Sequence, residues 1–141
     1  MQHDEMIGRV QALAQLPDRG SAEQATRAVL ETLAERLPSG LAEHTAAQLP
    51  STLAAAMRRL TASSPDGRSH PSGEPFDLTV FAGRIAGRAG TDEDTAVREA
   101  AAVLEVLDAA LTPELTEKLA GTLPADIREL LPVGRTANGT D

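Results

Sequence analysis

Hydrophobic residues along the chain recur at intervals of three and four positions, which is the spacing of helices with one buried face. In the first half of the chain this pattern predicts four helices. The first covers roughly residues 3–16, and the second begins at Ser21, where Gln24 completes a capping box. A short third helix follows, and a fourth opens at Pro50. The positions that we expect to be buried here are Met6, Val10, Leu13, Leu16, Ala25, Val29, Leu33, Leu37, Leu41, Thr45, Leu49, Leu53, Met57 and Leu60.

The second half repeats this plan with a further set of helices. The first of them is expected to end at Gly90, a residue type suited to a helix C-terminus. Residues 91–94 supply a cap and an acidic first turn for a long helix. Thr112 starts a shorter helix, and Pro124 opens the last one. The positions that we expect to be buried here are Phe81, Ile85, Ala89, Ala96, Ala100, Val103, Leu107, Leu111, Leu115, Leu119, Leu123, Ile127, Leu130 and Leu131.

The two halves also match residue by residue. The segment VLETL at residues 29–33 matches VLEVL at residues 103–107, an offset of 74, and Gly8-Arg9-Val10 matches Gly83-Arg84-Ile85 at an offset of 75. One extra residue in the turn between the first two helices explains the change of offset. We therefore predict an all-α fold in which two similar four-helix repeats pack into one helical bundle body. The predicted divisions are a first repeat (1–61), a Ser/Pro/Gly linker (62–75), a second repeat (76–131) and a flexible tail (132–141).

Composition supports this fold and narrows the function. Hydrophobic residues make up 41% of the 141 positions and aromatic residues only 1%, so the core must be aliphatic. The formal net charge is −8, which makes nucleic acid a poor partner. There is no cysteine, which excludes disulfides and thiolate chemistry. We expect no signal peptide and no membrane span, and we expect a cytoplasmic protein.

Candidate catalytic and metal-binding residues do not form a site in the sequence. His3, His44 and His70 have no second ligand at helical spacing, so we predict no metal site. Residues 92–94 lack the ligand spacing of a calcium loop and are interpreted as a helix N-terminus. A possible nucleophile, base and acid lie in the flexible linker, which cannot hold a catalytic triad: Ser63, Ser64, Asp66, Ser69 and His70.

The glycine-rich segment GRIAGRAG at residues 83–90 follows no strand and lacks the lysine of a phosphate-binding loop. We interpret Gly83 and Gly87 as positions where two helices approach closely. The sequence therefore predicts no catalytic, cofactor-binding or metal-binding residues, no cofactor and no enzymatic activity.

One polar arrangement remains as a hypothesis about architecture. Arg9 and Arg84 occupy matching positions in the two halves, and so do Glu31 and Glu105. We hypothesise matching ion pairs between helices, Arg9 with Glu31 and Arg84 with Glu105. The alternative is that these are independent solvated charges.

Residues 28–50 and 101–131 resemble the bacterial domain-of-unknown-function family numbered 2267. The resemblance rests on FAGRIAGRAG followed by an acidic cap, on the VLE segments, and on the Leu-Pro pair after each short helix. It covers roughly residues 3–60 and 76–132. It implies a small all-helical protein of two similar halves, and it implies no established activity. Gly83 and Gly87 depart from the family pattern, which usually has charged helix formers there.

These observations favour a non-catalytic protein–protein interaction module that self-associates or docks on another protein. An exposed apolar stripe or a groove between the halves is the expected contact surface. The alternative is a carrier of a small hydrophobic ligand with an aliphatic pocket between helices. A nucleic-acid binder acting through Arg58 and Arg59 is a third class, which the acidic net charge disfavours. The expected partners are a protein or a second copy of the chain, with no nucleic acid and no membrane.

Overall fold

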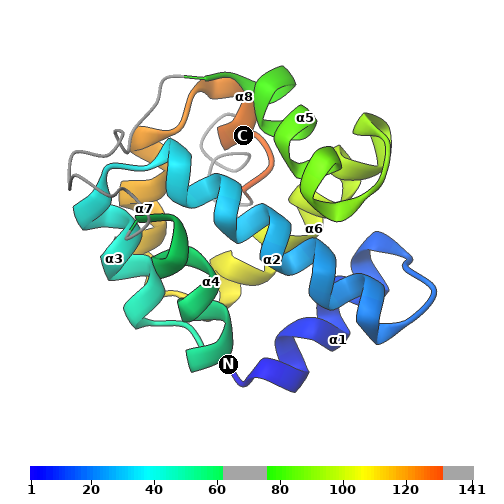
Figure 1. The fold of residues 1–141 in the computed structure, drawn as a ribbon. Coiled ribbons are helices and arrows are strands. Elements are labelled where there is room, and N and C mark those ends of the chain that lie inside the picture. The colour runs from blue at the N-terminus through cyan, green and yellow to red at the C-terminus, as the bar shows by residue number, and fades with distance from the viewer. Residues whose placement is uncertain (62–75, 132–141) are drawn as a thin grey trace, which may run out of the picture.

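In the computed structural model, which describes residues 1–61 and 76–131, the chain is all-helical, as predicted (Figure 1). The segments predicted as linker and tail lie outside the described residues. The helices are α1 (His3–Ala14), α2 (Arg19–Arg36), α3 (Ser39–Ala47), α4 (Ser51–Thr61), α5 (Leu78–Ala89), α6 (Glu93–Ala110), α7 (Pro113–Thr122) and α8 (Ala125–Arg128). None of the described helices is long and apolar enough to cross a membrane.

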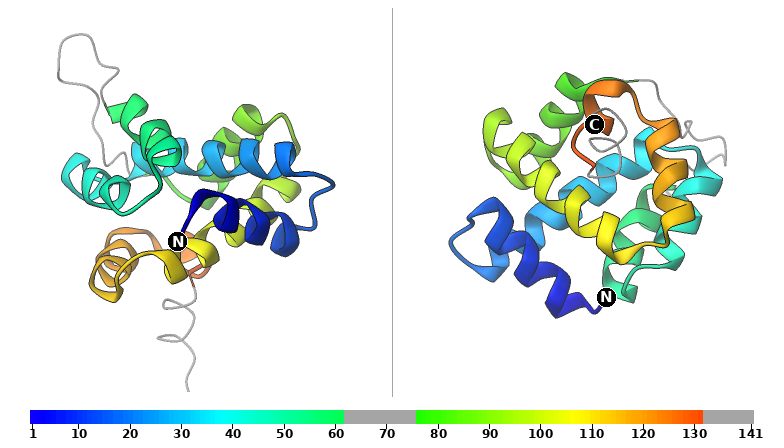
Figure 2. Two further views of the ribbon diagram at one scale, coloured as in Figure 1. Left: turned by 90° about the horizontal axis from the view of Figure 1, so that it is seen from below. Right: turned by 180° about the vertical axis from the view of Figure 1, so that it is seen from behind.

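The two longest helices, α2 and α6, organise the packing. They contact each other, and each also carries helices from the other half of the chain: α1 packs on α6, and α5 packs on α2. Figure 2 shows from below that α3 and α4 lie on the side of α2, whereas α7 lies on the side of α6. Aliphatic side chains from both halves and the two phenylalanines form one continuous core. The helices are thus packed together as one body.

Short polar side chains cap the N-termini of α2, α5, α6 and α7, and the cap of α2 differs from the sequence prediction. The cap of α2 is Asp18, whose Oδ1 accepts a hydrogen bond from the Ser21 backbone N–H at 2.7 Å. The predicted capping box that starts at Ser21 is therefore wrong. An aspartate at this position already satisfies a free N–H of the first turn, so α2 begins two residues earlier.

In the second half, the end of α5 and the starts of α6 and α7 are as predicted. Asp92 caps α6 by accepting a hydrogen bond from the Thr95 N–H at 2.7 Å. Gly90 ends α5 in the left-handed conformation, with φ of 71°. Thr112 caps α7, with Pro113 in the first turn. The last helix, α8, is a single turn and is shorter than the predicted pattern suggested, whereas α5 and α6 have the same lengths as α1 and α2, 12 and 18 residues.

Most of the positions predicted to face the core are buried, and α1 contains the clear exception. Leu13 is 45% exposed, whereas Ile7 and Ala14 are buried in its place. Helix α1 contacts both α2 and α6, so its buried face extends from Met6 through Ile7 and leaves Leu13 at the edge. The side chain of Leu60 lies outside the described residues. Four other predicted core positions are half-buried against the core: Leu16, Leu41, Ala89 and Leu130.

Candidate functional site

A network of charged side chains joins α2 to α5 through Glu35. Arg88 binds both carboxylate oxygens of Glu35, with Nη1–Oε1 of 3.0 Å and Nη2–Oε2 of 2.7 Å. Arg84 donates to the same Oε1 at 3.0 Å. Arg88 Nη1 also donates to the Thr32 hydroxyl at 2.7 Å. Bidentate hydrogen bonds between an arginine and a carboxylate are strong and fix the orientation of both side chains.

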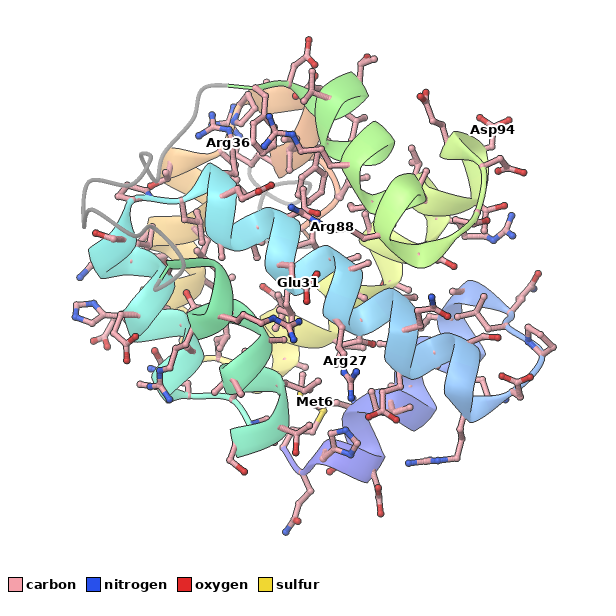
Figure 3. The ribbon with its side chains drawn as sticks, viewed as in Figure 1. Met6, Arg27, Glu31, Arg36, Arg88 and Asp94 are labelled. Carbon is pink, nitrogen blue, oxygen red and sulfur yellow. The ribbon has the colours of Figure 1, made fainter. Side chains whose placement is uncertain are left out.

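A second carboxylate, one turn earlier on α2, extends the network to α4. Glu31 forms an ion pair with Arg59 of α4. Its other oxygen lies 3.9 Å from Arg88 Nε. Figure 3 shows Arg88 reaching from α5 toward the side of α2 that carries Glu31 and Arg27. Two glutamates of α2 therefore tie together helices from both halves of the chain.

The hypothesised pairs of Arg9 with Glu31 and Arg84 with Glu105 are wrong. Arg9 instead contacts Glu5 of its own helix at 3.3 Å, and Glu31 pairs with Arg59. Arg84 contacts Glu35 because α5 packs on α2, the long helix of the other half. The hypothesis assumed that each pair forms within one half.

Arg84 and Glu35 are further held by their surroundings. The Arg84 guanidinium carbon lies 4.4 Å from the centre of the Phe76 ring, a cation–π contact. Burial by itself raises the pKa of the Glu35 carboxyl. The hydrogen bonds and charges of Arg88 and Arg84 outweigh this effect and hold the pKa of Glu35 below its ordinary value. Glu35 is thus an ionised carboxylate at neutral pH.

A polar groove lies beside this network, and we call it the arginine groove. Its volume is about 460 Å³. Arginines from three helices line it: Arg27 of α2, Arg59 of α4 and Arg88 of α5. The remaining lining residues are Gly20, Glu23, Gln24, Ala28 and Glu31.

A second groove, of about 500 Å³, runs between α1 and α6, and we call it the α1–α6 groove. Among the described residues, Leu13 and Val80 are the large apolar side chains that are exposed, and Leu13 lines this groove. Its lining residues are Arg9, Ala12, Leu13, Glu105, Val106, Asp108 and Ala109. The lining therefore combines apolar side chains with the charged side chains of Arg9, Glu105 and Asp108.

The internal sequence match relates this groove to the ion network. At the offset of 75, Leu13 corresponds to Arg88. At the offset of 74, Val106 corresponds to Thr32 and Ala109 corresponds to Glu35. The helix packing corresponds too, because α1 lies on α6 and α5 lies on α2. At the α2–α5 interface, Arg88, Thr32 and Glu35 bind one another. At the α1–α6 interface, the corresponding residues are apolar and line a groove.

The two described histidines, His3 and His44, lie on different helices, α1 and α3. His3 has Asp4 and Glu23 within 3.6 Å, His44 is exposed on α3, and His70 lies outside the described residues. Within the described part of the chain, no group of three or more His, Asp or Glu side chains is arranged to hold a metal ion. The candidate triad residues 63–70 also lie outside the described residues.

The two glycines of the GRIAGRAG segment do not mark a close helix contact, so that interpretation is wrong. A Cβ at Gly87 would meet no atom within 4 Å, and one at Gly83 would meet only the end of the Glu93 side chain at 3.6 Å. The acidic segment 92–94 is the start of α6, as predicted. Hydrogen bonds from the backbone N–H and the side chain of Thr95 lower the pKa of Asp92.

A search of curated proteins finds no match to the chain. A family model described as "Uncharacterized conserved protein (DUF2267)" matches residues 3–130. The match spans all eight described helices, including both grooves, and it agrees with the resemblance seen in the VLE and Leu-Pro segments. The chain therefore belongs to the DUF2267 family.

Proposed function

We propose that the protein is a non-catalytic interaction module that self-associates through the α1–α6 groove. The exposure of Leu13 carries this proposal. A leucine that is 45% exposed beside Val106 and Ala109 offers apolar area that association would remove from water. The corresponding position of the other interface is Arg88, which is engaged within the fold.

The charges that flank the groove favour a second copy of the chain as the partner. Arg9 lies on the α1 side and Glu105 on the α6 side. In a two-fold symmetric dimer both copies use the same surface, so a residue of one side of the groove contacts a residue of the other side in the second copy. Arg9 of one copy would then face Glu105 of the other, with the Leu13 side chains between them.

A small hydrophobic ligand is the second candidate, because the groove has a suitable size. Binding sites for small molecules have volumes of about 300–1,000 Å³, and this groove has about 500 Å³. A ligand would contact the exposed apolar residues of the lining, Leu13 and Ala109. The two candidates differ in stoichiometry, because a ligand adds a small mass to a monomer.

The test compares Leu13→Glu with Val80→Glu. Val80 is the matched control because it is similarly exposed, at 39%, and lies on α5 away from the groove. Sedimentation equilibrium over a range of concentrations should show a wild-type dimer, a monomeric L13E variant and a dimeric V80E variant. Native mass spectrometry of the same samples detects a bound small molecule.

Three results would overturn self-association. A wild-type protein that stays monomeric at every concentration is one, and an equal loss of dimer in both variants is another. A monomer that carries a small hydrophobic mass, lost in L13E only, would establish the ligand carrier instead.

A further inference from the structure

We propose that the arginine groove binds the phosphate group of a small molecule. Three guanidinium groups line it from three different helices, Arg27 from α2, Arg59 from α4 and Arg88 from α5. The inference is independent of the proposed self-association, because the arginine groove shares no lining residue with the α1–α6 groove.

Two of the three guanidinium groups retain capacity to bind an anion. The side chain of Arg27 is 48% exposed, and that of Arg59 is 64% exposed. Among the described residues, each donates through a single terminal nitrogen, Arg27 to Glu23 at 3.3 Å and Arg59 to Glu31. A guanidinium carries five N–H donors, so both retain donors for a ligand.

The third guanidinium is held in place before any ligand binds. Arg88 is fixed by both oxygens of Glu35 and by the Thr32 hydroxyl. Its Nε lies 3.9 Å from Oε1 of Glu31, which also lines the groove. An anion that enters the groove therefore meets one positioned arginine and two that are able to adjust. Positioned donors lower the entropy cost of binding.

The local charge of the groove differs from that of the whole protein. Three arginines line it against two glutamates, Glu23 and Glu31. The chain as a whole has a net charge of −8. Glu35 is not among the lining residues, but it binds Arg88, so three carboxylates balance the three arginines. An anion is therefore recognised by the unused N–H donors of the groove and not by an excess of positive charge. Glu31 binds Arg59 and also repels an incoming anion, so its charge lowers the affinity of the site for phosphate.

Phosphate fits this arrangement better than a carboxylate does. A carboxylate presents two oxygens in one plane, which suits a single arginine fork. A phosphate group presents oxygens in several directions and carries more charge, so it can accept hydrogen bonds from arginines on separate helices. The groove volume of about 460 Å³ leaves room for the remainder of a small phosphate ester.

The test titrates the full chain with inorganic phosphate and then with a nucleoside monophosphate, with chloride at matched ionic strength as the reference. Backbone amide shifts of Gly20 and Gln24 in NMR spectra report on the groove. We expect saturable shifts with both phosphates and not with chloride. Arg27→Gln and Arg59→Gln should each weaken binding about tenfold, the value of one charge-assisted hydrogen bond.

Arg58→Gln is the matched control for Arg59→Gln, because it removes the same charge from the neighbouring arginine of α4. Arg58 is 46% exposed and is bound to Glu43, and it lines neither groove. R58Q should leave phosphate binding unchanged. Glu31→Gln should strengthen binding several-fold, because it removes the opposing charge.

The proposal fails if phosphate produces no saturable shift, or if R58Q weakens binding as much as R59Q. It also fails if E31Q weakens binding, since Glu31 would then be part of the recognition. A short DNA duplex provides the last comparison. The duplex could bind in a way that depends on Arg27 and Arg59 while inorganic phosphate shows no saturable binding. That result would identify a nucleic acid, and not a small molecule, as the ligand of the groove.

Discussion

Arg88 and Glu35 meet across the interface of α5 and α2 through two parallel hydrogen bonds, of 3.0 and 2.7 Å. Both side chains are largely shielded from solvent, and Glu35 is only 15% exposed. A pair in this setting is weakly screened, so it contributes more than a surface ion pair does. It also joins α2 of the first half to α5 of the second.

Glu35→Gln should lower the free energy of unfolding by about 1–3 kcal/mol, because it removes charge from an acceptor that serves both Arg84 and Arg88. Urea denaturation followed by circular dichroism measures the effect. Glu5→Gln is the control, since Glu5 pairs with Arg9 on the surface, and it should change stability very little. Equal effects of the two variants would show that the α2–α5 pair contributes no more to the free energy of unfolding than a surface ion pair does.

The lowered pKa of Glu35 gives the pair a pH dependence of known sign. A carboxyl whose pKa is lower in the folded state than in the unfolded state stabilises the fold above its unfolded pKa. That contribution is lost as the pH falls through the lowered folded pKa. The stability difference between wild type and E35Q should therefore be full at neutral pH and shrink on acidification. A difference that stays constant down to low pH would contradict this assignment.

The helical plan could be predicted from the sequence because the spacing of residues such as Val29 and Leu33 sets one buried face. Leu13 could not be placed this way, since its exposure depends on how α1 lies between two neighbours. Helix α1 contacts both α2 and α6, which moves the buried face toward Ile7. A periodic pattern predicts a face but not the number of helices that cover it.

The sequence contains the residues of the ion network at helical spacing, but the hypothesis drawn from it paired the wrong helices. Glu31 and Glu35 are four residues apart, and so are Arg84 and Arg88, so each pair lies on one face of its helix. These two faces of opposite charge meet in the structure. The sequence-based hypothesis considered one residue of each pair and joined helices within each half. The packing of α5 on α2 is a tertiary contact that the local pattern does not contain.

Glu99 has the opposite pH behaviour to Glu35. Its side chain is buried on α6, and its Oε1 has no hydrogen-bond partner among the described residues. Burial raises the pKa of the Glu99 carboxyl, and the charge of Asp92 adds to this while that of Arg98 opposes it. A raised folded pKa means that Glu99 favours the fold below its unfolded pKa and that this support is lost as pH rises.

Glu99→Gln should therefore raise the melting temperature by roughly a few degrees at neutral pH, because the amide carries no charge to bury. Below the ordinary pKa of glutamate the wild-type carboxyl is protonated, and the gain should vanish. Thermal melts of both proteins across the acidic range measure this. A gain that persists at low pH would assign the effect to packing instead of charge.

Gly87 is exposed within α5, and a Cβ there would meet no atom within 4 Å. Gly87→Ala should therefore stabilise the fold by about 0.5–1 kcal/mol, because alanine loses less backbone entropy in a helix. Gly90→Ala is the contrasting variant. Gly90 ends α5 with φ of 71°, a conformation that costs alanine about 1–2 kcal/mol. Urea denaturation of both variants should give changes of opposite sign. Destabilisation by G87A would mean that another surface packs closely on this face of α5, as the sequence pattern had suggested.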